Sequence, residues 1–390
     1  MKKHLLVALA IALALALAIG VSACGDSGGD SGGTPDNNFN TTTPPHLQGG
    51  DNNQQGGDSG SETPASNVPQ KGDNERTHNF TWAHPYPATH HHHADIILPF
   101  VDRVFEASEG TINITVIPGG AITTTATAVD DVTSGAVDLT WTLPGNTPGR
   151  FPLLTCFEFM DHFTSAVEAT EAMWGVLYES EAFRNEFSAY KLFNVYGTEM
   201  GEIWTIDQVR TPSDLAGMPL RAASPMSERM LRAYGAVTVG MGMPDVYDNI
   251  ERGVIRGLGT APSAIPTYNL NEILDHGTDG LYLYTTTQIM AMSWRAWSQL
   301  SPWQQYIFDS VSGLDFAIES AQLYDDLGNA ARQNIPGLQL NRLTDAEKAL
   351  FKVDADRVIA DYMAEITALG HDAQAHYNTM LSVRDALRAR

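Results

Sequence analysis

Apolar and polar residues alternate along the chain in patterns that predict short strands separated by helices. Residues 112–117 carry apolar side chains at every second position, as a half-buried strand does. Residues 94–108 repeat apolar positions at the spacing of a helix, and Gly110 follows as a stop signal. A helix at 126–134 and a strand at 137–141 continue this order. Repeated strand–helix–strand units predict a mainly parallel sheet with helices on both faces.

The second half of the chain continues the same alternation. Residues 211–214 read Thr-Pro-Ser-Asp, which combines an N-cap, a proline and an acidic residue at the start of a helix. We expect strands at 219–222 and 237–241, each followed by a helix, at 226–234 and 245–252 respectively.

A longer helical pattern begins at Ser301-Pro302 and runs to about residue 334, with Gly313 as an internal weak point. If continuous, this helix spans about 50 Å. A single small lobe cannot use that length, so the helix is expected to lie across two lobes. The remaining residues, from 344 onward, are predicted to be helical and to pack on the outside.

The N-terminal region has the pattern of an exported lipoprotein. Residues 5–19 form an unbroken apolar run after two lysines, and about fifteen residues are fewer than the roughly 20 of a membrane-spanning helix. Residues 21–24, Val-Ser-Ala-Cys, resemble a bacterial lipobox, in which the cysteine is diacylated and becomes the new N-terminus. We therefore interpret 1–23 as a lipoprotein signal peptide and Cys24 as the lipidation site. The alternatives are a plain signal peptide or a membrane helix.

Residues 24–76 are predicted to be a disordered tether. They are rich in Gly, Asp, Ser and Asn and nearly free of aliphatic residues, so they cannot bury enough apolar surface to fold. A flexible chain of about fifty residues reaches roughly 40 Å. The folded part that follows is long enough for two domains.

Composition narrows the function. The formal net charge is −23, which argues against a nucleic-acid partner and against adhesion to an anionic membrane. There are two cysteines, so lipid on Cys24 leaves Cys156 unpaired, and its apolar surroundings predict a buried, inert thiol. The predicted folded part, from residue 77 onward, lacks a Gly-x-Ser-x-Gly elbow, an HExxH motif and a P-loop, so we expect no enzyme and no cofactor. A paired-carboxylate hydrolase leaves no linear signature and stays open.

Several motifs occur in a fixed order along the chain, between about residues 78 and 345. They are EGTI and VIPGG within 109–120, SGAVD at 134–138, TPSDLAGMPLR at 211–221, YGA at 234–236, DVY at 245–247, and the residues from Met292 to Gln305. In this order they resemble the extracytoplasmic binding proteins of tripartite ATP-independent periplasmic (TRAP) transporters, the DctP-like group.

The resemblance implies an α/β, two-lobed, periplasmic-binding-protein-like fold with a central ligand cleft and a long helix spanning both lobes. The solute-binding domain would cover 77–345, with lobe 1 at about 77–200, lobe 2 at about 201–300, the long helix at about 301–334 and C-terminal helices at 346–390. The implied function is capture of a small organic acid and its delivery to the membrane permease subunits of a TRAP transporter. The protein would stay at the extracytoplasmic face of the membrane through its lipid anchor.

Arg221 is the first candidate ligand-binding residue. It ends a short predicted strand, and ligands of open α/β sheets bind beyond the carboxyl ends of strands. Its planar guanidinium can hold a carboxylate bidentately, and in the family the matching arginine does so. The alternative is an internal salt bridge. Ser224 matches a position that adds a hydrogen bond to the ligand, and equally fits the N-cap of the next helix.

Further candidates come from the resemblance. Trp141 and Asn146 flank a loop that lines the family's cleft, although core packing or a turn would also explain them. Met243 matches an apolar contact to the ligand. Gly253 and Thr260 bracket a segment that supplies a second polar contact.

The chain also departs from the family pattern. The strand at 200–204 lacks a frequent second arginine, and Arg256 and Gly259 replace two acidic positions in the family's G-x-V-D-G-x-E stretch. A metal bound through the second of these positions is therefore not expected. Arg256 is either a substitute cation or a surface residue.

Histidines 90–93 are consecutive. Imidazoles bind metals, but neighbouring side chains at a helix start diverge, so we expect solvated or hydrogen-bonded histidines near the cleft and no metal site. His84 follows the first strand and is placed in the pocket. The competing interpretations of the chain are an ABC-type substrate- or metal-binding lipoprotein and a ligand-sensing receptor subunit.

Overall fold

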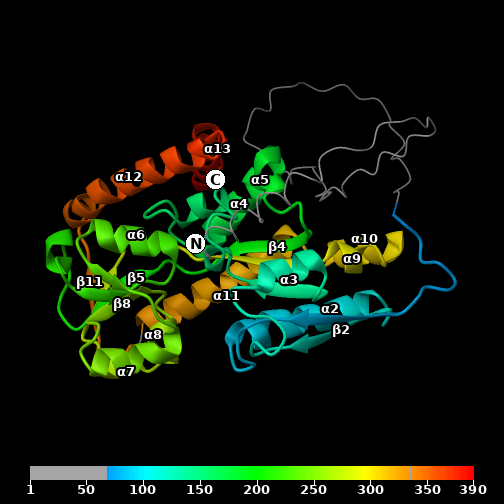
Figure 1. Cartoon of the computed structure of the whole chain (residues 1–390), viewed down its shortest axis with the longest axis horizontal. Coiled ribbons are helices and arrows are strands. Elements are labelled where there is room, and N and C mark those ends of the chain that lie inside the picture. The colour runs from blue at the N-terminus through cyan, green and yellow to red at the C-terminus, as the bar shows by residue number, and fades with distance from the viewer. Residues whose placement is uncertain (1–67, 334) are drawn as a thin grey trace, which may run out of the picture. The chain divides into compact units, whose positions relative to one another are not determined.

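The computed structural model describes residues 68–333 and 335–390, which contain two mixed β-sheets flanked by helices (Figure 1). The predicted signal peptide, Cys24 and most of the predicted tether lie outside the described residues. The sheets define two lobes, named here the first and the second lobe in chain order.

The first sheet has the strand order β2-β1-β3-β10-β4. Its strands are β1 (His78–Ala83), β2 (Ile112–Ile117), β3 (Leu139–Thr142), β4 (Lys191–Gly197) and β10 (Thr287–Met292). β1 pairs with β2 and β3 in parallel, while β10 pairs with β3 and β4 in antiparallel. Parallel pairing was predicted correctly for the early strands, and β10 is the exception.

The second sheet has the strand order β11-β9-β5-β8-β6-β7. Its strands are β5 (Glu202–Thr205), β6 (Pro219–Arg221), β7 (Val237–Val239), β8 (Gly257–Thr260), β9 (His276–Asp279) and β11 (Gln339–Arg342). β6 is parallel to both of its neighbours, whereas β5 is antiparallel to β8 and β9. The two sheets agree with the predicted two-lobed α/β fold, whereas the expected mainly parallel pairing does not hold for β5.

The helices largely follow the predicted periodicity. Those of the first lobe are the π-helix η2 (His92–Ile97), α2 (Leu98–Ala107), α3 (Ala128–Ser134), the 3-10 helices η3 (Pro144–Asn146) and η4 (Leu154–Glu158), α4 (Ala166–Glu179), α5 (Glu181–Asn185) and α9 (Trp294–Trp297). Those of the second lobe are η5 (Pro212–Leu215), α6 (Pro225–Ala233), η6 (Met243–Asp245), α7 (Val246–Glu251), α8 (Ala264–Thr267) and η7 (Leu270–Glu272).

Two crossing segments, 198–201 and 281–286, connect the lobes and pair with each other. The Gly201 N–H donates to the Tyr284 carbonyl across 2.8 Å, and the Leu283 N–H donates back to Gly201 across 2.9 Å. The chain thus returns to the first lobe before β10. The predicted second lobe of 201–300 ends too late for this reason, because residues 287–292 complete the first sheet.

The predicted helix at 301–334 is split at Gly313 into α10 (Pro302–Ser310) and α11 (Leu314–Gln333). Gly313 has a φ of +84°, a left-handed conformation that favours glycine and ends the regular helix. The 20-residue helix α11 still spans both lobes, over about 30 Å. Near its start, Phe316 stacks on Phe100 of the first lobe, and near its end Ala331 packs in the apolar core around Trp204 of the second.

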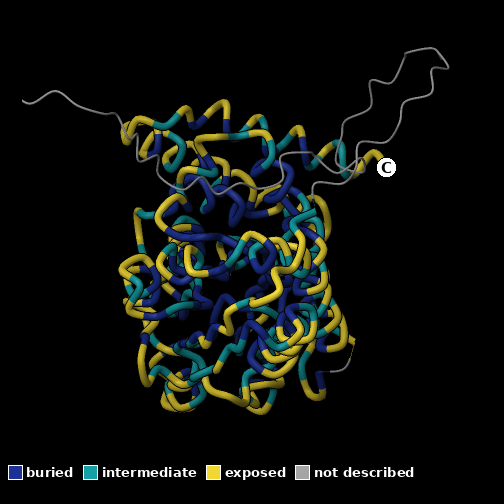
Figure 2. Tube along the Cα trace, turned by 90° about the vertical axis from the view of Figure 1, so that its right-hand side faces the viewer, coloured by how far each residue is buried: buried dark blue, intermediate teal, exposed yellow. Residues whose placement is uncertain are grey.

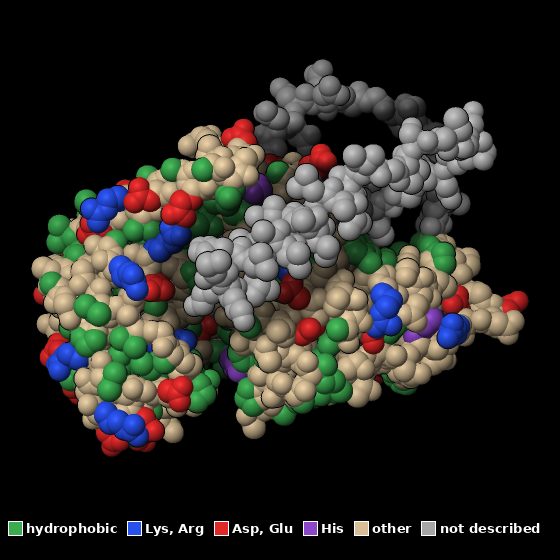
Figure 3. Space-filling model, viewed as in Figure 1, with side chains coloured by type: hydrophobic (Ala, Val, Ile, Leu, Met, Phe, Trp, Pro, Cys, Tyr) green, Lys and Arg blue, Asp and Glu red, His purple; other side chains and the backbone are tan. Residues whose placement is uncertain are grey.

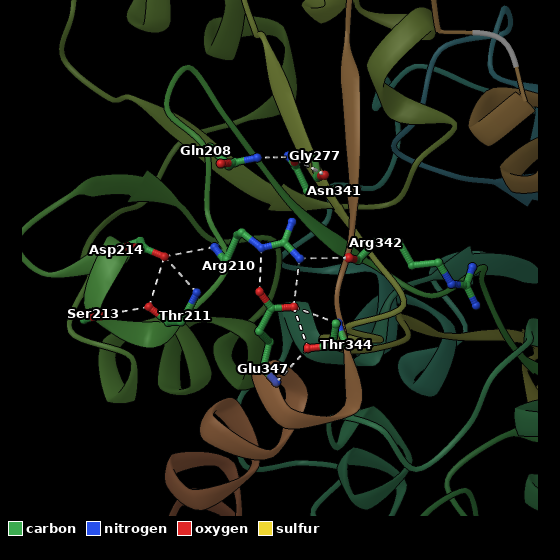
Figure 4. Close-up of polar contacts among 10 residues, drawn as sticks. All are labelled: Gln208, Arg210, Thr211, Ser213, Asp214, Gly277, Asn341, Arg342, Thr344 and Glu347. Atoms are coloured by element: carbon green, nitrogen blue, oxygen red, sulfur yellow. Dashed lines mark hydrogen bonds and ion pairs between the residues drawn. The ribbon is translucent and has the colours of Figure 1, made fainter.

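The last two helices, α12 (Asp345–Ala368) and α13 (Ala373–Arg388), form an outer C-terminal arm (Figure 1). Figure 4 shows how α12 begins on the second lobe, where the guanidinium of Arg210 is paired with the Glu347 carboxylate and Thr344 caps the helix. α13 reaches the first lobe, where His376 Nε2 donates to the Leu153 carbonyl across 2.9 Å.

The apolar core fills both lobes and lies beneath an exposed outer layer (Figure 2). In the first lobe Trp82, Phe100 and Phe193 meet edge-to-face or stacked. Cys156 is a buried free thiol, and burial raises its pKa well above the usual value. This confirms the predicted inert cysteine.

Candidate ligand-binding site

Arg221 is a buried cation at the carboxyl end of β6. Its side chain is 9% exposed, and its Nε donates to the Met241 carbonyl across 3.3 Å. Burial lowers the pKa of Arg221. In the chain from 68 to 333 and from 335 to 390, no carboxylate lies within ion-pair distance of it. The internal salt bridge considered for Arg221 is therefore absent from this part of the protein, and its charge is available for another anion.

Three tyrosines lie within electrostatic reach of Arg221. They are Tyr284 of the second crossing segment, Tyr268 after α8, and Tyr86 after β1. Their phenol groups partly oppose the fall in the pKa of Arg221 that burial causes. Tyr86 belongs to the first lobe and Tyr268 to the second, so residues from both lobes converge on the cation.

Trp141 of β3 belongs to an aromatic wall on the first lobe, which we define as Tyr86, His90 and Trp141. The Trp141 ring lies 4.4 Å from the Tyr86 ring and 5.5 Å from the His90 ring, measured between centroids. Its Nε1 donates to Gln288 Oε1 across 2.6 Å. Asn146 is exposed in η3. Burial raises the pKa of Tyr86, and the nearby Asn146 side chain partly opposes this shift.

His84 is fully buried and packs against Trp141. Its Nε2 lies 2.9 Å from His93 Nδ1, and its ring centroid lies 5.4 Å from that of Trp141. Burial, and then the neighbouring His93, lowers the pKa of His84 to about 4, so the ring is neutral at pH 7. The structure thus places His84 beside the aromatic wall without any exposed surface.

Ser224 caps α6 and also contacts the first lobe. Its Oγ accepts the Ser227 N–H across 3.2 Å and donates to Glu158 Oε2 across 3.2 Å. The capping role proposed for Ser224 is therefore present, while its role toward a ligand stays a prediction.

The remaining predicted residues are divided between the site and its surroundings. Thr260, at the end of β8, lies near the Tyr284 phenol, which in turn lies within electrostatic reach of Arg221. Met243 is half-buried and packs on the second lobe's core. Gly253, with a φ of +73°, forms an exposed turn after α7. Among the described residues neither Met243 nor Gly253 has a side-chain hydrogen bond to Arg221, and their roles toward a ligand stay predictions.

Two further possibilities raised by the sequence were a substitute cation at Arg256 and a metal site. Arg256, considered as a substitute cation, is paired with exposed Asp207, its Nε lying 2.8 Å from the carboxylate. Within the described residues, no group of three or more His, Cys, Asp or Glu side chains could hold a metal ion. In that same part of the chain, no helix is long and apolar enough to cross a membrane.

Sequence reasoning missed the tyrosines around this site and the buried acid Glu158, which accepts a hydrogen bond from Ser224. Tyr86 lies two residues after His84, close enough to the strand end to have been included. Tyr284 follows β9 in a segment that carries no sequence motif. Its position depends on how the chain crosses between the lobes. Figure 3 shows the surface hollowed between the two lobes.

The comparisons with known proteins agree with this arrangement. The family DctP, described as bacterial extracellular solute-binding protein, family 7, matches residues 82–366. A TRAP solute-binding protein from an unidentified marine microbe, specific for aromatic acids and bound to metahydroxyphenylacetate, is 27% identical, with a TM-score of 0.73 over 79% of this chain and 98% of that chain.

Two less similar structures share the fold. A TRAP solute-binding protein from Rhodoferax ferrireducens with copurified benzoate is 24% identical, with a TM-score of 0.74 over 80% of this chain and 99% of that chain. A Bordetella pertussis receptor that binds pyroglutamic acid is 17% identical, with a TM-score of 0.68 over 79% and 100% of the two chains.

Proposed function

Because the chain belongs to the DctP family of bacterial extracellular solute-binding proteins, we propose that it captures an aromatic carboxylic acid between its two lobes. Arg221 would hold the carboxylate, and the rings of Tyr86 and Trp141 would contact the aromatic part. The observation that carries the proposal is a buried guanidinium with no carboxylate partner among the described residues.

The electrostatics favour an anionic ligand despite the protein's negative charge. A buried cation without a partner is costly, and a ligand carboxylate would relieve that cost through charge-assisted hydrogen bonds. The diffuse charge of −23 lies mostly on exposed side chains, and salt screens such charges within about 10 Å. The local cation therefore dominates inside the site.

The aromatic character of the ligand is inferred from the rings that surround Arg221. Flat aromatic side chains form offset or edge-to-face contacts with an aromatic ligand. Two structures of one marine protein, 27% and 26% identical to this chain, hold metahydroxyphenylacetate and 3-hydroxybenzoate. Both the rings near Arg221 and this similarity support the same ligand class.

Delivery and anchoring complete the proposal. The ligand would be passed to the membrane permease of a TRAP transporter, because the similar solved structures are TRAP solute-binding proteins. Attachment to the extracytoplasmic face of the membrane through Cys24 rests on the sequence at 21–24. Acyl labelling of the parent and of Cys24→Ser tests the anchor, and equal labelling of the two would refute it.

A ligand screen followed by calorimetry tests the ligand class. We expect benzoate-type acids to raise the melting temperature, while aliphatic dicarboxylates and sugar acids do not. Arg221→Ala should weaken binding at least about a hundredfold, because two charge-assisted hydrogen bonds are lost. Arg221→Lys should recover only part of the affinity, since an ammonium lacks the planar fork.

Arg256→Ala is the matched control, because this arginine is exposed and already paired with Asp207. It should leave the affinity unchanged. An affinity within a few-fold of the parent for both Arg221 variants would show that the carboxylate is held elsewhere.

A further inference from the structure

His90 presents a fixed hydrogen-bond donor. It lies two residues before the start of the π-helix η2, and the backbone N–H of His92 donates to its Nδ1 across 3.2 Å. A backbone N–H can only donate, so Nδ1 carries no proton, and the proton of the neutral ring is on Nε2. Burial, and then His91, lowers the pKa of His90 to about 4, which keeps the ring neutral at pH 7.

His90 is part of the aromatic wall, and Tyr86 of the same wall lies near Arg221. The His90 ring lies 5.5 Å from the rings of both Tyr86 and Trp141, and Tyr86 is also within electrostatic reach of Arg221. The His90 side chain is only half-buried. In the part of the chain that the structure describes, its Nε2 has no hydrogen-bond partner and is not fully covered.

A buried network holds this donor in place. The His92 ring stacks on Trp141 with centroids 3.5 Å apart, and the Tyr196 hydroxyl lies 2.8 Å from His92 Nδ1. Gln288 Oε1 accepts from both Trp141 Nε1 and the Tyr196 hydroxyl, across 2.6 and 3.0 Å. The backbone N–H that orients His90 therefore comes from a residue whose own ring is fixed on two sides, as preorganised binding requires.

We propose that His90 Nε2–H donates a hydrogen bond to an oxygen substituent on the ring of the bound aromatic acid, so that the site prefers ring-oxygenated acids to benzoate. This inference rests on the proposed function and adds a second point of recognition to it. Arg221 takes the carboxylate and His90 takes the oxygen on the ring. Because a neutral N–H accepts no proton from the ligand, the substituent acts as an acceptor.

Calorimetric titration of the full chain with benzoate, 3-hydroxybenzoate and 4-hydroxybenzoate tests the proposal. We expect the parent to bind at least one hydroxybenzoate about tenfold more tightly than benzoate, the effect of one well-formed hydrogen bond. In His90→Asn the side chain can still accept the His92 N–H but has no donor at the Nε2 position. This variant should lose the preference and bind benzoate as the parent does. His90→Gln places a donor near the Nε2 position and should keep part of the preference.

The outcomes separate the two proposals. If the parent binds no aromatic acid, the proposed ligand class and this inference both fail. If benzoate binds in an Arg221-dependent way but neither hydroxybenzoate is preferred, or if His90→Asn keeps the preference, the inference alone is overturned.

A measurement on the unliganded parent adds a test that does not depend on the affinities of the variants. Ring nitrogen NMR of the histidine-labelled chain, with the His90 signals identified by their loss in His90→Gln, should show the Nε2–H tautomer. The Nδ1–H tautomer would overturn the proposal.

Discussion

Ser224 of the second lobe donates its hydroxyl to Glu158 of the first lobe across 3.2 Å. The other carboxyl oxygen of Glu158 accepts from the N–H and the hydroxyl of Thr287, across 3.3 and 2.9 Å. Burial raises the pKa of Glu158 to about 7, and these hydrogen bonds only partly oppose the shift. The contact between the lobes therefore includes a carboxyl group that titrates near neutral pH.

We expect Glu158→Gln to remove a pH dependence of the unfolding free energy between about pH 4.5 and 7. The folded carboxyl, with a pKa of about 7, keeps a proton that the unfolded carboxyl releases above its usual pKa of 4.5. Unfolding then releases a proton, so this contribution to stability is complete below pH 4.5 and is lost as the pH rises to 7, by about 3 kcal/mol.

Urea unfolding at several pH values from 4.5 to 8 measures this slope. The exposed Glu181→Gln is the control and should keep the parent's pH dependence. An unchanged slope in Glu158→Gln would show that Glu158 is ionised throughout this range.

His376 should give the opposite pH dependence. Its Nε2 donates to Leu153, while its Nδ1 is buried without a partner among the described residues, so a second proton would have no acceptor. Burial lowers the pKa of His376 to about 4. Below pH 6.5 the unfolded imidazole takes up a proton that the folded ring does not bind. The contribution of His376 to the unfolding free energy is therefore complete above pH 6.5 and is lost as the pH falls to 4.

His376→Gln should make the protein less sensitive to acid by about 2 kcal/mol at pH 4.5, because the amide keeps a donor for Leu153 and cannot be protonated. Denaturant unfolding at pH 7 and pH 4.5 measures the difference. A variant that loses as much stability in acid as the parent contradicts this prediction.

Gly328 of α11 is expected to resist replacement by alanine. Helix propensity alone would favour Ala by about 1 kcal/mol. A Cβ at this position, however, would lie 2.8 Å from Glu199 Cγ and 2.9 Å from Glu199 Cβ, in the crossing segment 198–201. Gly328→Ala should therefore lower the unfolding free energy by about 1–3 kcal/mol.

Thermal unfolding of Gly328→Ala and of Asn329→Ala, an exposed neighbour on the same helix, separates propensity from packing. Asn329→Ala should be neutral or stabilising. Glu199→Ala in the Gly328→Ala background should restore part of the loss, and additive effects of the two changes would argue against the contact.

Arg221→Met should stabilise the unliganded protein while it abolishes binding of the acid. An unpaired buried charge costs free energy that an apolar side chain of similar length does not. We expect a gain of about 1–2 kcal/mol in the unfolding free energy without ligand, a trade-off typical of functional sites. Urea unfolding of the ligand-free proteins measures it, and a loss of stability would mean that Arg221 has a structural role.

Local signals in the sequence were enough to place Arg221 and Ser224. The strand that ends at Arg221 and the cap at Ser224 depend on a few neighbouring residues, and the structure has both. The pairing of β10 with β3 and β4 depends on the path of the whole chain. A run of residues such as Thr287–Met292 has the same pattern in either lobe, so no local rule could assign it.

Of the tyrosines around Arg221, Tyr268 and Tyr284 could not be predicted for the same reason, whereas Tyr86 lies close to a predicted strand end. Tyr86, Tyr268 and Tyr284 come from three separate segments, and each is an ordinary apolar residue in its local pattern. The four consecutive histidines were expected to be solvated or hydrogen-bonded. His90, His92 and His93 form hydrogen bonds, whereas His91 Nε2 is buried without a partner among the described residues. The tautomer of His90, however, follows from the backbone geometry of η2 and has no signal in the sequence.

The place of β10 in the first sheet also determines when each lobe can be completed during synthesis and export. β10 lies between β3 and β4, yet it follows β5 to β9 of the second sheet in the chain. Until residue 292 has emerged, β3 and β4 lack their common partner and leave backbone groups unpaired, which is a hazard for aggregation. A fragment that ends at the first crossing therefore lacks the strand that joins β3 to β4 in the first sheet.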